Sequence, residues 1–468
     1  MGVYVDRLSS LPEPLLSAIV SSLSFQEAVR TSILSKNWVN ICKSTTNIEF
    51  NELKFVRFDQ SPENIDAQRR AFSAFTKKWI ENRTEDAVVN FSLRISKPEL
   101  FNQLINRCIE FAIRNGVKNL ELDFTYPSWV KDGFYYDVYI TSFDLPTCIY
   151  DYGRIEYLKL YSCNFITSAI TKFHSLKEIS LGYMKLSLCT IKTLLSNCEK
   201  LESISLSNCW SSDNFNLNEK YPKLKKLIIN QCHFKLDILR VNAPNLRIFN
   251  YHGLMMNYVA DIQSPRLHEA NLDFSPEYGS QGHGTHLYNL MKEFISVRIM
   301  VVCSFMLQVI YTGGRPKRTH RKMDVRHLIM KTALHKYEFM GITFMLRSCC
   351  YLEHLTIDLC EEKYLLDYEA MEEVNPETFW IDIKKPYKCM RLSLKEIEIM
   401  GFKGTENEIS VVSYLITNGK ALRKMSIKVH RYDLEEEAAR KVAVCRKAVQ
   451  YLMMLPTLSS HLEMRVYW

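Results

Sequence analysis

Apolar residues recur through the middle of the chain in one short pattern: an apolar residue, two variable positions, an apolar residue, one variable position and a third apolar residue. In the segment 155–160, Leu158 and Leu160 flank Lys159. In an extended strand the two leucines point to one side and the lysine to the other. The pattern therefore predicts β-strands with one buried face. The six clearest copies are IEYLKL (155–160), LKEISL (176–181), LESISL (201–206), LKKLII (224–229), LRIFNY (246–251) and LHEANL (267–272).

These copies follow one another at a nearly constant period. Their first residues lie 21 to 25 positions apart, and leucine-rich repeats have periods of about 20–29 residues around an L-x-x-L-x-L core. Stacked repeats bury a continuous leucine core that no single short strand could bury. We therefore expect an α/β leucine-rich-repeat solenoid; the alternative is two unrelated sheet domains. Weaker copies, spaced by insertions or degenerate repeats, are VKNLEL (117–122), VRIMVV (297–302), VRHLIM (325–330), LEHLTI (352–357), LKEIEI (394–399) and LRKMSI (422–427).

Residues 6–43 have helical periodicity instead. Pro12 and Pro14 suit the first turn of a helix, and Ser24 with Glu27 forms a capping box that opens a second helix. Ser35 can cap a third helix. Three short helices make a small core, because so few residues can be buried. Such a unit is suited to docking on a partner through exposed apolar residues.

The segment LSSLPEPLLSAIVSSLSFQEAVRTSILSKNW resembles an F-box of the plant type almost continuously over residues 6–38. The third helix departs from the family pattern at Asn37, Val39 and the pair Ile41-Cys42. The resemblance implies a substrate receptor of a Skp–cullin–F-box ubiquitin ligase, in which the F-box binds a Skp-type adaptor and, through it, the cullin scaffold. It places the adaptor interface, or the small core behind it, at Leu8, Leu11, Pro12, Leu15, Leu16, Ile19, Ile33, Leu34 and Trp38.

Residues 388–427 resemble the FBD module that often closes plant F-box proteins. Within it, Thr405 and Glu408 form a further capping box, and an acidic helix start follows Asp433. The FBD-like end should therefore read strand, helix, strand, helix. The expected organisation is an F-box over 1–45, a leucine-rich-repeat array over 46–360, an acidic insertion or exposed loop over 361–387 and an FBD-like α/β module over 388–468.

The composition is that of an ordinary globular protein, with 47% hydrophobic and 24% charged residues. A net charge of +8 spread over 468 residues lacks the concentrated basic surface of a nucleic-acid binder. The longest apolar stretch, 299–311, is too short to span a membrane, which needs about 18–20 residues. Without a signal peptide, we expect a location in the cytoplasm or nucleus with reduced cysteines.

The cysteines fit the repeat. Cys163, Cys209, Cys232 and Cys360 each follow the last apolar position of a repeat by three residues, which is the N/C position of the leucine-rich-repeat consensus. We expect buried structural thiols rather than metal ligands, because closely paired cysteines of the C-x-x-C kind do not occur. No cofactor or metal is expected. The glycine- and histidine-containing stretch 279–286 is interpreted as a loop between repeats.

The residues that alternate with the buried leucines should form one exposed row for a protein substrate of unknown identity. Neighbouring strands lie about 5 Å apart, so these positions would form a continuous strip. Aromatic and basic residues are common binding hot spots, which favours Tyr157, Lys159, Tyr161 and Lys226. The predicted substrate-binding residues are Tyr157, Lys159, Tyr161, Ser180, Ser205, Lys226, Ile228, Asn250 and Asn271.

The sequence therefore favours a non-catalytic adaptor that brings a target protein to a ubiquitin ligase. Sequence motifs of hydrolases, zinc proteases and nucleotide-binding loops are missing from the chain. Two alternatives stay open. One is a repeat scaffold that no longer docks the ligase, with a vestigial helical unit. The other is a receptor in which a small ligand completes the substrate site. The basic run 315–322 is open to a nuclear import signal or an acidic-partner contact as well as to a solvated loop.

Overall fold

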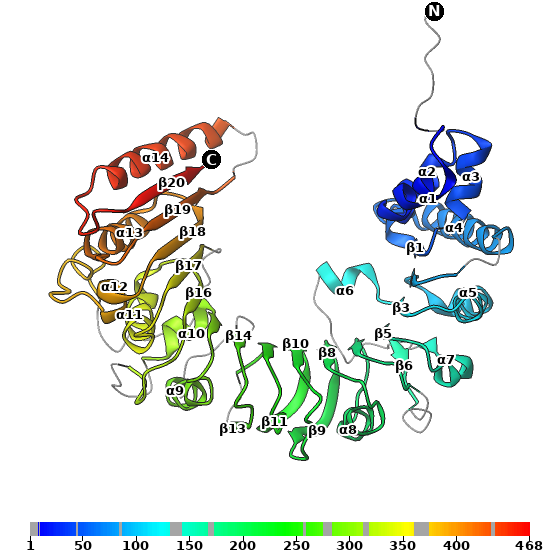
Figure 1. Ribbon diagram of the computed structural model, residues 1–468, viewed down its shortest axis with the longest axis horizontal. Helices are drawn as coiled ribbons and strands as arrows, with labels where there is room; N and C mark the ends of the chain where they lie inside the picture. The colour runs from blue at the N-terminus through cyan, green and yellow to red at the C-terminus, as the bar shows by residue number, and fades with distance from the viewer. Residues whose placement is uncertain are drawn as a thin grey trace, which may run out of the picture. The chain divides into compact units, whose positions relative to one another are not determined.

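The computed structural model describes residues 8, 10–43, 45–83, 87–131, 143–166, 173–255, 259–274, 283–311, 318–359, 374–431 and 436–468 (Figure 1). The chain divides into two compact units. The first comprises Met1–Asp213 and Cys232–Phe234, and the second comprises Asn214–Gln231 and Lys235–Trp468. Each unit is a stack of parallel strands with helices or a second layer of strands on one face, as repeats of this period require.

Three short helices open the first unit: α1 (Glu13–Ser22), α2 (Phe25–Thr31) and α3 (Lys36–Lys43). Pro12 is the N-cap of α1 and Pro14 lies in its first turn, where a missing N–H costs nothing. The predicted capping box is confirmed, because the Ser24 side chain accepts from the Glu27 N–H and the Glu27 carboxylate accepts from the Ser24 N–H. The Ser35 hydroxyl accepts from the Trp38 N–H at 3.5 Å.

Strands of the first unit pair in parallel, each with the next repeat along the chain. The segments between them carry the short 3-10 helices η1 (Glu52–Lys54) and η2 (Pro98–Leu100), the helices α4 (Pro62–Glu81), α5 (Asn102–Arg114), α6 (Pro127–Lys131), α7 (Thr147–Asp151) and α8 (Leu188–Asn197), and the two-residue strands β4 (Phe143–Asp144) and β6 (Cys163–Asn164). The strands of the sheet are β1 (Asn47–Asn51), β2 (Asn90–Arg94), β3 (Asn119–Asp123), β5 (Tyr157–Tyr161), β7 (Glu178–Gly182) and β8 (Ser203–Ser207).

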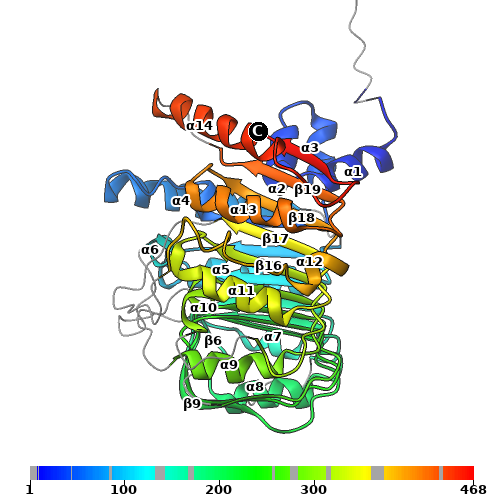
Figure 2. The same cartoon turned by 90° about the vertical axis from the view of Figure 1, so that its left-hand side faces the viewer.

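The second unit continues the same parallel pairing from β10 to β20. Its strands are β10 (Lys226–Asn230), β12 (Ile248–His252), β14 (Glu269–Asp273), β15 (Ile299–Val302), β16 (His327–Thr332), β17 (His354–Leu359), β18 (Glu396–Phe402), β19 (Lys424–Val429) and β20 (Glu463–Tyr467). Figure 2 shows α11 and α13 lying in front of β16–β19, on one face of this sheet.

The return segments of the second unit change character along the chain. The repeats that follow β10 and β12 return through extended strands, β11 (His233–Val241) and β13 (Val259–Ile262), which pair in parallel. Strand β9 (Trp210–Leu217) crosses the boundary between the two units. Later repeats return through the helices α9 (His283–Glu293), α10 (Ser304–Val309), α11 (Phe339–Ser348), α12 (Lys388–Leu392), α13 (Glu406–Asn418) and α14 (Glu436–Met453), with a short 3-10 helix, η4 (Lys336–Glu338).

The residue after several strands adopts a left-handed backbone. Ser162, Tyr183 and Asn208 have φ of 57°, 53° and 51°, and each directly follows a strand of the first unit. Gln231 occupies the same place after β10, with φ of 48°. This conformation is uncommon outside glycine, so its recurrence at one repeat position marks the turn by which the chain leaves the sheet.

The cysteines lie where the repeat predicts. Cys163, Cys209 and Cys232 are buried, and the Cys209 Sγ lies 3.5 Å from the Leu181 carbonyl oxygen. Burial raises the pKa of the Cys209 thiol well above its usual range. Every cysteine in the described part of the chain is a free thiol. Cys360, the fourth residue of this series, lies outside the described residues.

In each of the twelve repeat copies identified in the sequence, a strand starts at the third residue of the pattern. Eight further strands of the described residues were not predicted: β1, β2 and β20, which extend the parallel pairing, and β4, β6, β9, β11 and β13. In β1 the first apolar position is taken by Thr45, which is buried ahead of Ile48 and Phe50. A polar residue at that position hides the pattern from sequence reading.

The interpretation of 279–286 as a loop is wrong for its last four residues, and the loop that ends at 387 holds two buried aromatic residues. Residues 283–286 form the first turn of α9 rather than a loop, and Gly284 is buried there; residues 279–282 lie outside the described part. In the stretch interpreted as an acidic exposed loop, residues 374–387 are anchored by Trp380 and Tyr387, which are 3% and 6% exposed. Aromatic packing explains the anchoring, because the Trp380 ring lies 5.1 Å from that of Tyr414.

The expected strand–helix–strand–helix order at the C-terminal end is present as β18, α13, β19 and α14, followed by β20. The predicted capping box of α13 is confirmed, with Thr405 and Glu408 satisfying each other's backbone N–H groups. No helix of the described residues is long and apolar enough to cross a membrane.

Candidate functional site

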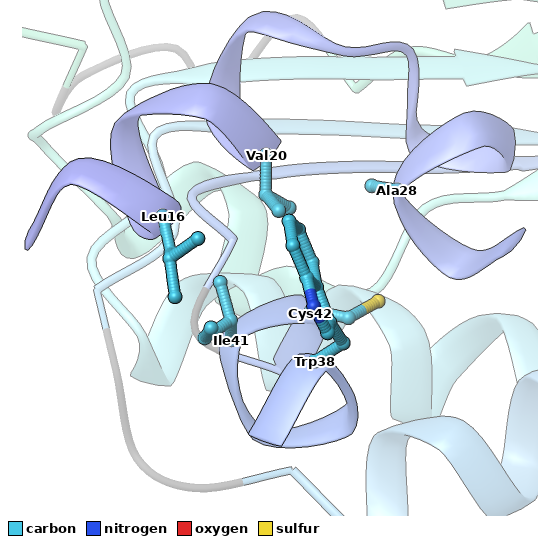
Figure 3. Packing of buried hydrophobic residues seen from close by; sticks show 6 residues of the cluster. All are labelled: Leu16, Val20, Ala28, Trp38, Ile41 and Cys42. Carbon is cyan, nitrogen blue, oxygen red and sulfur yellow. The ribbon is translucent and has the colours of Figure 1, made fainter. Parts of the chain in front are cut away.

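The helical unit has a filled core of its own. Leu16, Val20, Ala28, Trp38, Ile41 and Cys42 pack together, and each is at most 4% exposed. Figure 3 shows the Trp38 ring among Val20, Ile41 and Cys42, with contributions from α1 and α3. Ile41 and Cys42, where the sequence departs from the F-box pattern, are therefore core residues that fill space beside the indole.

The nine predicted adaptor residues separate into three groups. Leu16 and Trp38 belong to the core, and Leu11 and Ile19 are half-buried. The remaining five are exposed, with Leu8 at 48%, Leu15 at 53%, Ile33 at 85% and Leu34 at 62% of their possible surface, and with Pro12 also exposed. We call Leu8, Pro12, Leu15, Ile33 and Leu34 the exposed apolar set. Single exposed leucines are common, but five exposed apolar residues in so small a unit provide a surface for a partner.

An asparagine ladder joins this helical unit to the sheet. The Asn119 side chain donates to the Asn90 side chain at 2.6 Å, and Asn90 donates to Asn47 at 2.5 Å. Asn47 in turn donates to the carbonyl oxygen of Ser21, at the end of α1, at 3.2 Å. The three asparagines occupy the same register position in β1, β2 and β3. The ladder thus fixes the C-terminal end of α1 against the first repeats.

Tyr157, Lys159 and Tyr161 lie side by side on the outward face of β5, and all three are half-buried. The Lys159 ammonium lies 4.7 Å from the centre of the Tyr161 ring and 3.8 Å from the Glu121 carboxylate of β3. Burial and the nearby Glu121 carboxylate raise the pKa of Tyr157 to about 12. At neutral pH Tyr157 is therefore a neutral phenol, and it lies on the same strand face as an ammonium group that a carboxylate partly neutralises.

The predicted exposure of Ser180 is wrong. Ser180 pairs in register with Lys159, but only 9% of its surface is exposed. The neighbouring Tyr161 ring explains this, because its hydroxyl lies 3.4 Å from the Ser180 oxygen. The Tyr161 ring also lies over Gly182. A Cβ atom added to Gly182 would lie 2.8 Å from this ring. Ser205, one strand further along, is half-buried.

An aromatic series extends from Tyr161 that sequence reading missed. Tyr183 lies 5.7 Å from Tyr161 and 5.7 Å from Trp129, with the last pair stacked, and Trp129 lies 5.5 Å from Tyr126. Tyr183, Trp129 and Tyr126 lie beyond the ends of strands and not at alternating positions within them. The strand pattern therefore does not reveal them. The positive φ of Tyr183 directs the chain out of β7 at this place.

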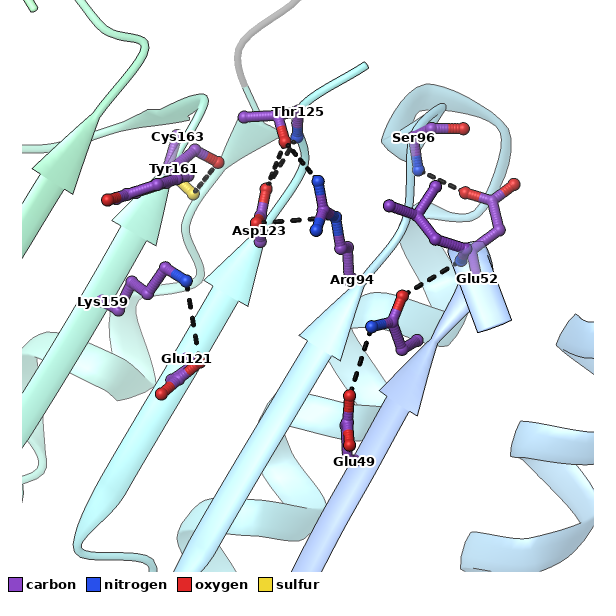
Figure 4. A network of polar contacts seen from close by, with 12 residues as sticks. Glu49, Glu52, Arg94, Ser96, Glu121, Asp123, Thr125, Lys159, Tyr161 and Cys163 are labelled. Atoms are coloured by element: carbon purple, nitrogen blue, oxygen red, sulfur yellow. Dashed lines mark hydrogen bonds and ion pairs between the residues drawn. The ribbon is translucent and has the colours of Figure 1, made fainter. Parts of the chain in front are cut away.

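A polar network borders the aromatic series (Figure 4). The Arg94 guanidinium lies 3.6 Å from the Asp123 carboxylate, which also accepts from the Thr125 hydroxyl at 2.6 Å. Farther towards β1, Ser96 donates its N–H to the buried Glu52 carboxylate. Asp123 is therefore fully partnered, and its charge is neutralised within the sheet.

The second unit carries its own outward row. Lys226, Ile228, Asn250 and Asn271 are half-buried on β10, β12 and β14. Ile228, Asn250 and Asn271 share one register position. The side-chain oxygens of Asn250 and Asn271 are shielded from solvent and accept no hydrogen bond from the described residues.

A polar hollow of about 370 Å³ lies farther along this face, over β16–β19. His327 and His354 line it with Glu396, Glu398 and Lys424. The His327 ring accepts from or donates to the Thr356 hydroxyl at 2.9 Å, and burial lowers the pKa of His327, with a further lowering by His354. Sequence reading did not select these residues, although they fall on the outward positions of weaker repeat copies.

Within the described residues, no cluster of three or more His, Cys, Asp or Glu side chains suits a metal ion.

Comparison with known proteins decides the family. A family model described as "At1g61320/AtMIF1, LRR domain" matches residues 80–457, and the F-box domain model matches residues 8–49. The chain belongs to the F-box/LRR-repeat proteins. It is 30% identical to the F-box/LRR-repeat protein At1g56400 of Arabidopsis thaliana over 479 aligned positions, which cover 100% of this chain and 98% of that protein.

Other Arabidopsis thaliana relatives agree. The F-box protein At3g62230 is 30% identical over 91% of this chain and 92% of its own length. The F-box/LRR-repeat protein At5g54820 is 31% identical over 99% and 98%. The repeat match continues to residue 457, so it includes β18, α13, β19 and α14. F-box/LRR proteins are typically non-catalytic adaptors.

Proposed function

We propose that this protein is the substrate-recognition subunit of a Skp–cullin–F-box ubiquitin ligase. The exposed apolar set carries the proposal, because it leaves five apolar side chains in water over a core that is already filled. An F-box domain implies a Skp-type adaptor, and a leucine-rich-repeat array implies a protein ligand. The cullin scaffold is reached through the adaptor.

The mechanism is proximity. The helical unit holds the ligase while the outward strand rows hold the target, so ubiquitin transfer becomes an intramolecular encounter at high effective concentration. The target row of the first unit would use Tyr157, Lys159 and Tyr161, which combine aromatic area with a cation, the types enriched at binding hot spots. The FBD-like end, β18 to β20, extends the strand face available to the target.

Adaptor binding is tested by removing apolar surface without touching the core. The variant Leu15→Ser, Ile33→Ser, Leu34→Ser should lose at least tenfold in affinity for a purified Skp-type adaptor, since each lost side chain removes about 1 kcal/mol or more of buried apolar area. Leu100→Ser, at a site 60% exposed outside the helical unit, is the matched control and should bind as wild type.

Wild-type adaptor affinity in the triple variant, with the fold retained by circular dichroism, would show that the exposed apolar set is not the adaptor surface. Failure of the wild-type protein to bind the adaptor would contradict the ligase role and favour the repeat scaffold that no longer docks the ligase. The receptor alternative has a separate outcome: capture of the target would need an added small molecule.

A further inference from the structure

An apolar hollow lies in the first unit, where α2 meets the first repeat. Residues of α2, β1, η1 and α4 enclose about 220 Å³. Five of its eleven lining residues are phenylalanines: Phe25, Phe50, Phe55, Phe72 and Phe75. None of the exposed apolar set lines it, so it is a separate feature from the surface assigned to the adaptor.

The phenylalanine rings of the wall pack against one another. Phe25 and Phe75 lie 5.4 and 6.4 Å from Phe50, both edge-on. Phe55 lies 6.2 Å from Phe75 in a stacked arrangement and is still 45% exposed. Rings that pack against one another shift little in position when a ligand binds. A half-exposed phenylalanine at the opening buries the most additional apolar area when a ligand covers it, so it stabilises the bound state most.

The rim is positively charged. Arg30, Lys54 and Glu49 surround the opening. The Glu49 carboxylate lies 2.8 Å from the Lys54 ammonium and accepts from the Asn51 side chain at 3.2 Å, so its charge is matched. Arg30 is exposed and makes no ion pair with the described residues, although it lies close enough to Glu27 to help lower the pKa of that carboxyl group. The Glu27 carboxylate is already bound to Ser24, so the Arg30 guanidinium can still donate to a further carboxylate beside the apolar hollow.

The size of the hollow decides the kind of occupant. Sites for whole small-molecule ligands are usually about 300–1,000 Å³, whereas about 220 Å³ accommodates one large side chain of a docked segment. We propose that this hollow binds a linear segment of a partner protein other than the adaptor. The segment places an aromatic or leucine side chain among the phenylalanines and an adjacent Asp or Glu against Arg30.

The test uses the full-length chain and defined peptides. The peptides are Ac-Gly-Ser-X-Z-Ser-Gly-NH₂, with Phe, Trp, Tyr or Leu at X and either Glu or its neutral twin Gln at Z, titrated by saturation-transfer NMR at low salt. At least one Glu peptide should bind the protein tenfold more tightly than its Gln twin.

Three variants locate the binding. Arg30→Glu should abolish the difference between Glu and Gln peptides, because it removes the carboxylate's partner. Gln26→Trp adds a large ring at an exposed position of the rim and should abolish binding of both members of each pair. Arg70→Glu, at an exposed position on α4 that does not line the hollow, changes the net charge equally and should bind as wild type.

Adaptor binding is measured on the same samples, so that failure of this proposal and failure of the ligase role are distinguishable. Arg30→Glu and Gln26→Trp should keep wild-type adaptor affinity; a loss would assign the hollow to the adaptor and overturn the proposal. Equal affinity of Glu and Gln peptides, or binding that survives Gln26→Trp, would also overturn it.

Tighter binding of 3-phenylpropionate than of every peptide would assign the hollow to a small molecule. A tenfold gain on deleting residues 2–7 would assign it to the chain's own N-terminal segment.

Discussion

At the scale of single residues, burial decides the role that each side chain can have. Leu15 and Leu16 are neighbours in α1, yet Leu15 is 53% exposed and Leu16 is fully buried. A helix turns about 100° per residue, so adjacent leucines face different surroundings. The first is available to a partner, and the second holds the helical unit together. Three buried polar or thiol groups lead to predictions about stability.

Glu338 predicts a pH dependence. Its side chain is fully buried at the start of α11, and burial raises the pKa of its carboxyl group from 4.5 to about 7. The folded protein therefore favours the protonated form. The stability that the protonated Glu338 contributes is complete below about pH 4.5 and is lost as pH rises through 7. The unfolding free energy of the wild type should therefore fall by roughly 3 kcal/mol across this range, and the Glu338→Gln variant should lack this fall.

The measurement is urea unfolding at several pH values from 4.5 to 8 for the wild type and the Glu338→Gln variant. The wild type should lose stability relative to the variant as pH rises. Two parallel stability profiles would show that Glu338 does not titrate in this range.

Cys209 tests the structural role of the repeat cysteines. It is fully buried, with its sulfur near the Leu181 and Ser207 carbonyl oxygens at 3.5 and 3.7 Å. Cys209→Ser should destabilise the protein by about 1–3 kcal/mol in chemical unfolding, because the hydroxyl is more polar than the thiol and its shorter bond to Cβ leaves it farther from the two carbonyl oxygens. Cys189→Ser, at the exposed cysteine of α8, should be neutral. Equal effects of the two changes would argue against a buried structural thiol.

The Arg69–Glu52 pair links α4 to η1. The Arg69 Nε lies 2.6 Å from Glu52 Oε1, and the two side chains are 6% and 1% exposed. Arg69→Met leaves the Glu52 carboxylate buried without its cation, which costs about 3–5 kcal/mol. Amide hydrogen exchange in α4 should accelerate more than a hundredfold. Arg114→Met, which breaks the exposed pair with Glu110, should leave exchange in its own helix within threefold of wild type.

At the scale of elements, each repeat combines a buried leucine face with an outward row whose chemistry is free to vary. The same register position holds Asn47, Asn90 and Asn119 in the first three strands and Tyr157 in the next. The asparagines are used to hold the helical unit through Ser21, whereas the tyrosine begins the aromatic surface. A row that serves attachment at one end can therefore serve binding a few strands later.

At the scale of the whole molecule, the surfaces proposed for ligase docking and for target binding are built from different elements, so they should be separable by mutation. Changing Tyr157, Lys159 and Tyr161 to Ala, Glu and Ala should reduce target capture at least tenfold while adaptor binding stays at the wild-type value. The physical reason is that aromatic area and a cation are lost from one strand face, while the core of the helical unit is untouched.

The measurement is side-by-side capture of the target, identified by proximity labelling with proteasome inhibition, and of purified adaptor. Changing Lys226 and Ile228 of β10 to Glu and Ser gives a comparison row in the second unit. Unchanged target capture by the β5 variant would move the target site to the outward row of the second unit.

The sequence by itself determined the repeat, the helical unit and their caps, because these depend on local periodicity: two residues per strand alternation, the turn of a helix, and a serine or threonine three residues before a glutamate. It also placed Cys163, Cys209 and Cys232 correctly as buried thiols. Where a polar residue took an apolar position, as Thr45 does before β1, that local signal failed.

Only the tertiary structure decided which outward residues remain accessible. Ser180 and Ser205 are equivalent in the repeat pattern, but the Tyr161 ring buries the first and not the second. The aromatic series Tyr161, Tyr183 and Trp129 and the phenylalanine-lined hollow join residues from separate repeats or elements. Such surfaces arise from contacts between side chains far apart in sequence, and no periodic pattern within one strand or helix specifies which neighbour will cover which residue.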